Sequence, residues 1–360
     1  MARYVPGKSL KEAERESGIQ AIKLASNENP FGPSPMAIEA IKRAASEVHW
    51  YPEVETPELR HVLAEKHAIA PDHVLVTAAT SSLLRIIGYT FLGPGLNAIT
   101  SELSFISYSI LAQAAGATMV KVPMRNYGYD LDGILATVNS DTRVILFANP
   151  NNPTGSFVPV DEVDRFLDRV PPHVVVVLDE AYSDFAEAFA AERGVEYSHG
   201  VRYVREGRNV IVARTFSKAQ GLAGLRLGYG LAHPDLIKNF DRVKTVFSVS
   251  TLAEAAGIAA LQDHQHIEKT ISNNLSGVKF LTEKLTEMEF QVLPTWANFV
   301  YVDVGEDSVA MAKRLEAEGI IVRPLAGWGA KTALRVTVGK PEENEAFVAT
   351  MKKLVSAAVK

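Results

Sequence analysis

The stretch Val210-Ile211-Val212-Ala213-Arg214-Thr215-Phe216-Ser217-Lys218-Ala219 joins a short apolar run to a polar segment that carries a lysine. Two earlier runs have the same form: Val144–Ala148 is followed by Asn149–Gly155, and Val174–Leu178 is followed by Asp179–Tyr182. Short runs rich in β-branched residues, bounded by polar or chain-breaking segments, are typical of buried parallel strands. In an open α/β sheet, ligands bind beyond the carboxyl ends of the strands. We therefore expect a lysine, an aspartate, a tyrosine and an asparagine to meet in one crevice.

These four polar residues form a set that suits pyridoxal phosphate. This cofactor acts as an electron sink, and proteins hold it as a lysine Schiff base with a carboxylate against the pyridine nitrogen. Lys218 supplies the amine, and Asp179 would keep the ring nitrogen protonated. Asn152 and Tyr182 can donate hydrogen bonds to the phenolate oxygen of the ring. The set therefore predicts a pyridoxal phosphate site.

Two further residues can hold the phosphate of the cofactor. Ser217 precedes the lysine, and Arg226 follows it with a guanidinium that matches phosphate geometry. Each residue also has an ordinary interpretation, since a lone aspartate at a strand end more often caps a helix and a lone lysine is usually a solvated charge. Together, in this order and at strand ends, the residues favour the cofactor site.

Strand-like and helix-like segments alternate through the first two thirds of the chain, which is typical of a mostly parallel sheet with helices on both faces. The strand-like runs are Val74–Thr77, Asn97–Thr100, Met119–Val122, Val144–Ala148, Val174–Leu178, Val210–Ala213 and Leu227–Leu231. Beyond about Phe247 the pattern changes to charged helices and two strand-like runs, Phe299–Val302 and Leu334–Val338. We therefore predict an α/β fold with a smaller α+β domain.

The chain resembles the fold-type I pyridoxal-phosphate-dependent aminotransferases, and within them the histidinol-phosphate aminotransferases. Asn-Asn-Pro-Thr-Gly at 151–155, Asp-Glu-Ala-Tyr at 179–182 and Thr-Phe-Ser-Lys at 215–218 are highly specific for the superfamily. The histidinol-phosphate branch is suggested by the amino-terminal segments Tyr4–Lys8 and Ser26–Gly32 and by Ile321–Gly327. The similarity covers nearly the whole chain and extends to Leu334–Gly339.

The resemblance implies a fold of type I, with a mostly parallel seven-stranded sheet and helices on both faces. It further implies a large cofactor-binding domain at residues 31–246. Residues 1–30 would pack with residues 247–360 as a small α+β domain.

Carried over residue by residue, the resemblance makes Lys218 the lysine that bonds to the cofactor and Asp179 the partner of its ring nitrogen. Asn152 and Tyr182 fall on the positions that contact the phenolate oxygen. Ser217 and Arg226 fall on phosphate-binding positions, with Thr215 close by. Phe105 falls where the family stacks an aromatic ring on the cofactor.

Four more residues match family positions around the substrate. Tyr51 corresponds to a tyrosine that reaches the cofactor phosphate of the neighbouring subunit, which implies a homodimer. Asn29 lies in the segment that borders the substrate pocket. Arg335 matches the arginine that binds the substrate carboxylate or, in this branch, the phosphate of histidinol phosphate. Arg323 matches a second arginine that assists with that phosphate.

The chain departs from the family pattern after the run Val74–Val76. The family usually has a glycine-rich turn and an acidic residue there, whereas this chain reads Thr77-Ala78-Ala79-Thr80-Ser81-Ser82-Leu83. Amides at a helix start bind phosphate without glycine, so we expect Thr80 and Ser81 to supply them and to add hydroxyl donors. The family usually has an acidic residue at the position of Ser82 and commonly an aromatic residue at that of Gln220. These two differences leave the identity of the substrate open.

The favoured function is transamination between an amine such as histidinol phosphate and 2-oxoglutarate, with Lys218 as general base for the 1,3-proton shift. An aromatic amino acid is an alternative amino donor. A pyridoxal phosphate lyase, such as a threonine-phosphate decarboxylase, is an alternative activity, since no motif shows which substrate bond is held perpendicular to the ring. A non-catalytic regulator on this scaffold carries an amino-terminal DNA-binding module, whereas this chain starts directly with the aminotransferase pattern.

Composition excludes several other classes. Lys and Arg total 37 against 42 for Asp and Glu in 360 residues, and no basic stripe with interleaved aromatics is present, so we expect no nucleic-acid partner. Cysteine is absent, which excludes disulfides, thiolate catalysis and cysteine-based zinc sites. No apolar stretch reaches the roughly 18 residues of a membrane span, and Met1–Pro6 lacks the apolar core of a signal peptide. We therefore expect a cytoplasmic location and no membrane partner.

Three features invite other interpretations. His264 and His266 lie two residues apart in a charged segment, where we expect a solvated surface and no metal site. We expect Asp184 to be a surface charge, because it lies past the end of its strand. Gly221–Arg226 is glycine-rich, but no dinucleotide-binding fingerprint follows the first strand.

Overall fold

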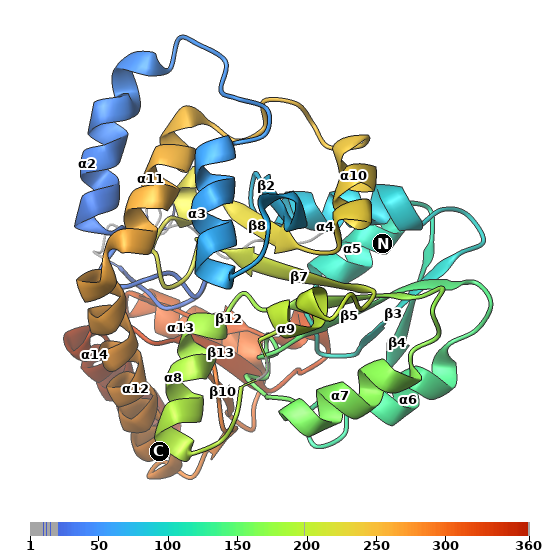
Figure 1. The fold of residues 1–360 in the computed structure, drawn as a ribbon. Helices are drawn as coiled ribbons and strands as arrows, with labels where there is room; N and C mark the ends of the chain where they lie inside the picture. Colours follow the sequence, from blue (N-terminus) through green and yellow to red (C-terminus); the bar gives the residue numbers. More distant parts are fainter. Residues whose placement is uncertain (1–9, 11, 13–14, 16–20, 198, 359–360) are drawn as a thin grey trace.

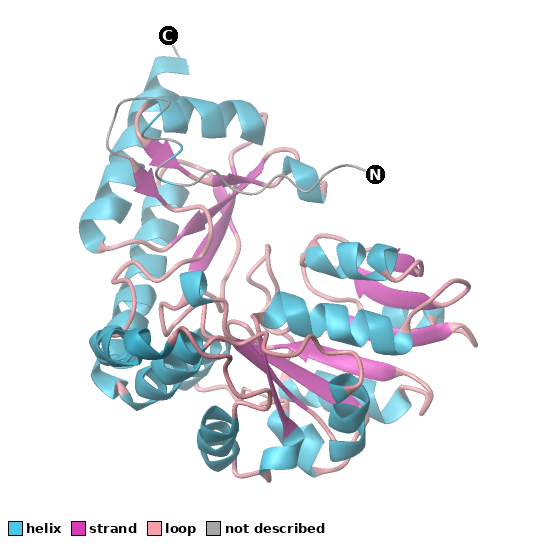
Figure 2. Ribbon diagram, turned by 90° about the horizontal axis from the view of Figure 1, so that it is seen from above, coloured by secondary structure: helices cyan, strands magenta, loops and turns pink. Residues whose placement is uncertain are grey.

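The computed structural model describes residues 21–197 and 199–358, together with residues 10, 12 and 15 (Figure 1). The segment Tyr4–Lys8, on which part of the family resemblance depends, lies outside the described residues. Figure 2 shows two regions with strands, a larger one at the lower right and a smaller one at the upper left.

The larger region is built on a seven-stranded sheet. Its strands are β2 (Val74–Thr77), β3 (Asn97–Ser101), β4 (Thr118–Val122), β5 (Thr142–Ala148), β6 (Val175–Asp179), β7 (Val210–Thr215) and β8 (Gly228–Leu231). They lie in the order β2-β8-β7-β6-β5-β3-β4. Strand β8 runs antiparallel to both of its neighbours, and every other pair in this sheet is parallel. The predicted mostly parallel seven-stranded sheet is confirmed.

Helices cover both faces of this sheet. One face carries α4 (Thr80–Phe91), α5 (Ser107–Ala114) and α10 (Pro234–Asp241). The other carries α2 (Pro35–Ala44), α3 (Pro57–His67), α6 (Leu131–Thr137), α7 (Val160–Arg169), α9 (Val201–Arg205) and α11 (Thr251–Gln262). Helix α8 (Ser183–Arg193) follows β6.

The two faces have separate apolar cores because side chains alternate along each strand. In β6, Val175 and Val177 point into the core beneath α4, α5 and α10, whereas Val176 and Leu178 point into the core on the opposite face. Strands buried on both faces need apolar residues at every position, which explains the continuous runs of valine, isoleucine and leucine in the sequence.

The smaller region is built on a four-stranded antiparallel sheet. Its order is β12-β13-β10-β9, from β9 (Gln291–Val292), β10 (Phe299–Asp303), β12 (Arg323–Pro324) and β13 (Ala333–Thr337). Helices α12 (His264–Thr286), α13 (Ser308–Ala317) and α14 (Pro341–Ala358) contribute to its core. Strand β1 (Ile22–Lys23) pairs in parallel with β11 (Ile320–Ile321), and Leu24 lies in the same core.

The division into domains at residues 31–246, and 1–30 with 247–360, stays a prediction. Residues 22–24 pack with the carboxyl-terminal sheet, in the manner that the division requires. Helix α11, in contrast, packs against α2 and α3, and its Ala253, Ala256 and Ala260 lie in the core of the larger region. On these contacts we propose that the smaller domain begins after α11, at α12.

Strand β2 turns into helix α4 through Ala79, which has a conformation that favours glycine. The φ and ψ angles of Ala79 are 69° and 161°, a region that is essentially restricted to glycine. In the aminotransferase family that the sequence resembles, this turn is usually rich in glycine. An alanine there stores strain of about 1–3 kcal/mol.

We predict that Ala79→Gly raises the free energy of unfolding by about 1 kcal/mol, because the relieved strain exceeds the entropic cost of the added flexibility. Urea denaturation followed by circular dichroism measures this difference. Ala78→Gly is the matched control: Ala78 has no positive φ, so the same change should lower the free energy of unfolding by about 0.5 kcal/mol. A destabilised Ala79→Gly protein would contradict the assignment of strain to this turn.

Candidate active site

A cavity of about 490 Å³ lies at the carboxyl ends of β5, β6 and β7. Twelve of the fourteen predicted site residues line it: Thr80, Ser81, Phe105, Asn152, Asp179, Tyr182, Thr215, Ser217, Lys218, Arg226, Arg323 and Arg335. Asn29 and Tyr51 are not among the lining residues. The fold therefore brings together strand ends and loops that are separated by up to 255 positions, from Thr80 to Arg335.

Asp179 is the last residue of β6, and its carboxylate is buried. Tyr108 Oη donates a hydrogen bond to Asp179 Oδ2 over 2.9 Å, and the backbone N–H of Ala181 donates to Oδ1 over 3.1 Å. Burial raises the pKa of Asp179 to about 6, although both hydrogen bonds favour the charged form. A protonated ring nitrogen would supply the positive partner that this buried carboxylate needs to stay ionised.

Sequence reasoning missed Tyr108. It lies in α5, 71 positions before the aspartate that it contacts, and no local pattern marks it. Burial and the neighbouring Asp179 raise the pKa of Tyr108 well above its ordinary value, so its hydroxyl stays a donor.

Lys218 follows the end of β7, and its amine faces the amino-terminal segment. Nζ donates a hydrogen bond to the backbone carbonyl of Ser26 over 3.1 Å. Burial and, after it, the positive charge of Arg335 lower the pKa of Lys218 to about 7. A large fraction of this amine is therefore uncharged near neutral pH, as a nucleophile for an aldehyde must be.

The start of α4 forms the candidate phosphate end of the cavity. Thr80 and Ser81 are its first two residues, and a helix N-terminus favours anions through its amides and its dipole. The hydroxyl of Thr80 donates to the carbonyl of Arg214 over 3.1 Å, so it is engaged within the protein. A Cβ on Gly228 would lie 2.7 Å from Thr80 N, so only glycine lets β8 approach the helix start.

Ser217 and Arg226 line the cavity together with the start of α4. Thr215 Oγ1 accepts a hydrogen bond from the backbone N–H of Ser217 over 3.1 Å, which fixes the loop before Lys218. Arg226 donates to the carbonyl of Ala223 over 2.7 Å through one of its five N–H groups, which leaves others for an anion.

A network orients the two residues assigned to the phenolate oxygen. Arg335 Nη1 donates to Asn152 Oδ1 over 2.6 Å, so the amide nitrogen of Asn152 keeps its own donors. Asn27 Nδ2 donates to Tyr182 Oη over 2.9 Å, which leaves the tyrosine proton free to donate. Arg335 Nη2 also donates to the carbonyl of Ala25 over 2.7 Å. Both side chains therefore suit the donor roles expected of them.

Two aromatic residues, Phe105 and Trp328, also line the cavity. The ring of Phe105 meets that of Tyr108 edge to face, with a centroid distance of 5.6 Å. Of these two residues, Phe105 lines the cavity and Tyr108 does not. The guanidinium of Arg323 lies over the ring of Trp328 at 4.9 Å. This stacking holds a long, flexible side chain at the cavity wall.

Asn29 lies behind the cavity wall. Its side-chain nitrogen donates to the carbonyl of Ala219 over 2.8 Å and to Thr270 Oγ1 over 2.9 Å. The amino-terminal residues that line the cavity are instead Ala25–Glu28. Asn29 thus ties this segment to the loop that carries Lys218, and its contact with substrate stays a prediction.

His266 is buried, contrary to the expectation of a solvated surface. Its Nε2 lies 3.3 Å from Asn29 Nδ2, whereas His264 is exposed. Among the described residues, no group of histidine and acidic side chains is arranged to hold a metal ion.

The two departures from the family pattern do not line the cavity. Ser82 Oγ donates to the carbonyl of Ala78 over 2.7 Å, a contact local to the turn. Gln220 is buried and donates through Nε2 to Asp184 Oδ2 over 3.4 Å. The sequence suggested that Asp184 is a surface charge. In the structure Asp184 is half-buried and accepts the hydrogen bond from Gln220.

Tyr51 lies outside the cavity. Its side chain is 83% exposed and stacks on Phe247 with a centroid distance of 4.7 Å. It belongs to a groove beside α2 and α11, so it does not reach the cavity of its own chain.

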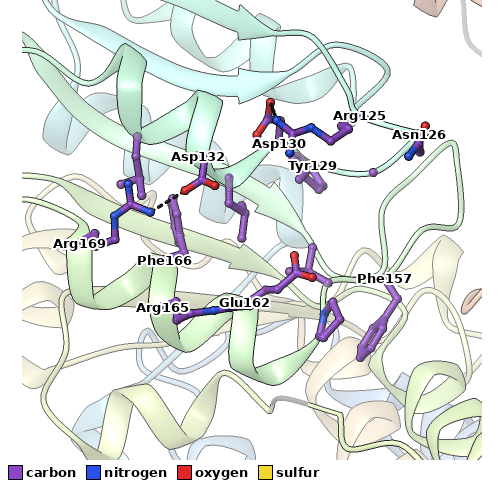
Figure 3. A pocket seen from close by; sticks show the side chains of 15 residues that line it. Arg125, Asn126, Tyr129, Asp130, Asp132, Phe157, Glu162, Arg165, Phe166 and Arg169 are labelled. Carbon is purple, nitrogen blue, oxygen red and sulfur yellow. Dashed lines mark hydrogen bonds and ion pairs between the residues drawn. The ribbon is translucent and has the colours of Figure 1, made fainter.

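A second cavity, of about 620 Å³, lies by α6 and α7 (Figure 3). Its arginines are paired with carboxylates: Arg169 with Asp132, Arg125 with Asp130, and Arg165 with Asp161. It contains none of the predicted site residues, so the chemistry belongs to the cavity around Lys218.

The residues present fit pyridoxal phosphate. A buried carboxylate suits the ring nitrogen, a lysine of lowered pKa suits the aldehyde, and a helix start with Arg226 suits the phosphate. Fold and site together define a fold-type I pyridoxal-phosphate-dependent enzyme.

The chain belongs to the family of class I and II aminotransferases, whose model matches residues 19–351. It is 40% identical to the histidinol-phosphate aminotransferase of Moorella thermoacetica, covering 98% of this chain and 90% of that protein. It is 42% identical to histidinol-phosphate aminotransferase 2 of Pseudomonas aeruginosa, covering 99% and 96%. The crystal structure of the histidinol-phosphate aminotransferase from Sinorhizobium meliloti, in complex with pyridoxal-5'-phosphate, superposes with a TM-score of 0.89 at 29% identity, covering 98% and 96%.

The protein is therefore a pyridoxal-phosphate-dependent aminotransferase. Within the described part of the chain, no helix combines the length and apolarity needed to cross a membrane.

The lowered pKa of Lys218 makes a prediction for cofactor binding. Only the uncharged amine attacks the aldehyde, so the rate at which apoenzyme binds pyridoxal phosphate should rise with pH up to about 7 and then level off. Below pH 7 it should fall about tenfold per unit, as the fraction of uncharged amine falls. Stopped-flow absorbance between pH 5.5 and 10 measures this rate. A rate that rises tenfold per unit up to pH 10, as for an ordinary lysine, would contradict the lowered pKa.

Proposed function

We propose that this aminotransferase moves the amino group between histidinol phosphate and 2-oxoglutarate. The observation that carries the proposal is a pair of arginines at the wall of the Lys218 cavity, Arg323 and Arg335. The names of the relatives, which are histidinol-phosphate aminotransferases, support it.

The two arginines lie directly opposite each other on the antiparallel strands β12 and β13. Like charges at such positions repel each other, and a bound anion offsets the repulsion. A phosphate carries nearly two negative charges near neutral pH and offers several acceptor oxygens, so it suits two guanidinium groups better than one carboxylate does. The same pair can accept the two carboxylates of 2-oxoglutarate in the second half of the reaction.

Bound pyridoxal phosphate supplies an electron sink for the negative charge that develops at the substrate carbon. Asp179 would hold the ring nitrogen of the bound cofactor in its protonated state, and Tyr108 and Ala181 hold Asp179 in place. Lys218 Nζ would serve as the general base and acid of the reaction, accepting a proton from the substrate and donating it back. A pKa of about 7 suits an amine that must both accept and release a proton near neutral pH.

Two alternatives stay open to experiment. An aromatic amino acid needs one arginine for its carboxylate and offers no second anionic group to Arg323. A lyase would release carbon dioxide in place of forming a new amino acid, and product analysis separates it from a transaminase. A cytoplasmic location stays a prediction.

The arginine pair predicts unequal effects of mutation. Arg323→Ala should lower kcat/KM for histidinol phosphate by about 30-fold or more, because a charge-assisted hydrogen bond contributes about 2–3 kcal/mol. With phenylalanine, which lacks a phosphate, the loss should stay below about threefold. Arg335→Ala should lower kcat/KM for both donors, because Arg335 also orients Asn152. Steady-state kinetics with both donors measure these losses, and equal losses on mutating Arg323 would favour the aromatic aminotransferase.

We also propose that the active unit is a homodimer with twofold symmetry. Apolar side chains cluster around Tyr51 at the surface: Val48 is 60% exposed, Trp50 70%, Val246 57% and Phe247 43%. An exposed cluster of this kind is typical of an interface. In the dimer, Tyr51 would reach the cofactor phosphate of the other subunit.

Hybrid dimers test the shared site. Tyr51→Phe and Lys218→Ala homodimers should each lose most activity. A dimer with one chain of each kind has one site with both defects and one with neither, so activity should reappear when the two proteins are mixed. Steady-state turnover of tagged and purified hybrids measures the rescue. Hybrids without any rescue would show that Tyr51 acts only within its own chain.

A further inference from the structure

Two carboxylates line the Lys218 cavity, Asp179 and Glu28. Asp179 is buried and bound by Tyr108 and Ala181, so it is committed to the ring nitrogen of the cofactor. Glu28 lies in the loop that follows β1, and its side chain is 43% exposed. Recognition of the cofactor and of the substrate phosphate does not require Glu28.

The backbone around Glu28 is fixed on both sides. Asn27 N–H donates to Thr337 Oγ1 over 2.9 Å, and Asn298 Nδ2 donates to the carbonyl of Asn27 over 3.1 Å. On the other side, the buried Asn29 is bonded to Ala219 and Thr270. Glu28 is therefore a carboxylate on a rigid support at the mouth of the site.

One oxygen of Glu28 remains available. Oε1 accepts a hydrogen bond from Lys23 Nζ over 2.7 Å. Among the described residues, no donor contacts Oε2. The charge of Glu28 also acts on Lys218, whose pKa it raises against the stronger effects of burial and Arg335.

The rest of the cavity wall is cationic. Lys218, Arg226, Arg323 and Arg335 suit the anionic groups of cofactor and substrate, whereas a carboxylate repels them. A carboxylate held in such a place needs a partner that donates hydrogen bonds or carries positive charge. Histidinol phosphate has one group of this kind besides its amine, the imidazole ring. A phenyl ring has none, and would leave Glu28 Oε2 without a donor from the substrate, while Oε1 keeps its bond from Lys23.

We propose that Glu28 accepts a hydrogen bond from the imidazole ring of the amino donor and so selects imidazole over a carbocyclic aromatic ring. The inference rests on the proposed function, since it assigns the second recognition element of the same substrate. Arg323 and Arg335 bind the phosphate end, and Glu28 binds the ring end. Glu28 is thus a specificity residue, and its contribution is largest when the imidazole is protonated.

The experiment compares two donors that differ only in the ring, histidinol phosphate and phenylalaninol phosphate, on holoenzyme with 2-oxoglutarate. Glu28→Gln should lower kcat/KM for histidinol phosphate by about tenfold or more, which is about 1.4 kcal/mol. For phenylalaninol phosphate kcat/KM should change by less than about threefold. The loss with histidinol phosphate should shrink between pH 6 and pH 8.5, because the imidazole loses its proton near pH 6.5.

Other charges act on Glu28, so a control is needed. Lys23 pairs with it from β1, and Lys218, Arg226, Arg323, Arg335 and Asp179 line the same cavity. The control variant Lys23→Gln breaks the ion pair and keeps the carboxylate, so it should leave the ratio of the two donors within about twofold of wild type. If Glu28 serves only to hold Lys23, the two variants will show the same donor ratio.

Equal losses for both donors with Glu28→Gln, or equal donor ratios in the Glu28→Gln and Lys23→Gln variants, would overturn the inference and leave the proposed function intact. A wild-type enzyme that does not turn over histidinol phosphate would overturn the proposed function itself. Isothermal titration of Lys218→Ala protein with each donor adds a readout of binding without turnover. Glu28→Gln in that background should weaken only histidinol phosphate.

Discussion

The buried carboxylate of Asp179 is the constraint on which the rest of the site depends. A carboxylate out of contact with water is costly unless donors or a cation stabilise it. Tyr108 and the backbone of Ala181 provide two donors, and yet burial still raises the pKa of Asp179 to about 6. A protonated ring nitrogen would complete the pairing, and the cofactor would in turn keep the charge that makes it an electron sink. The site is therefore built to be completed by its cofactor.

The parallel sheet explains how so many distant residues reach this carboxylate. Strands β5, β6 and β7 end at the same edge, so Asn152, Asp179 and Lys218 lie around one cavity. The smaller sheet adds Arg335 and Arg323 from β13 and β12. Arg335 joins the two regions, because it bonds to Asn152 of the larger one and to the carbonyl of Ala25.

The strands, and the residues at their ends that line the cavity, could be predicted from the sequence, because each is encoded locally. A valine run followed by Asp179, or by Ser217 and Lys218, shows both the strand and the residue at its end. The predicted ends of these seven strands all lie within two residues of the observed ends for the same reason. Family resemblance added Arg323 and Arg335, whose roles no local pattern indicates.

Residues whose roles depend on tertiary contacts could not be predicted. In the sequence Tyr108 cannot be distinguished from an ordinary helix residue, because its contact with Asp179 depends on the packing of α5 on the sheet. Asn29 and Glu28 are neighbours in one polar segment, and only the backbone direction decides that Glu28 lines the cavity and Asn29 lies behind it. His266 lies in a charged segment, but α12 turns it towards Asn29.

The most direct test of this account is the turnover of Asp179→Ala holoenzyme with histidinol phosphate, beside Asp184→Asn as a control carboxylate outside the cavity. Removal of a charge so close to the reacting ring should raise the activation free energy by several kcal/mol. This corresponds to a loss in kcat of more than about 100-fold. The Asp184→Asn enzyme should stay within about threefold of wild type. An Asp179→Ala enzyme that binds its cofactor and works within about tenfold of wild type, about 1.4 kcal/mol, would contradict the central role of this carboxylate.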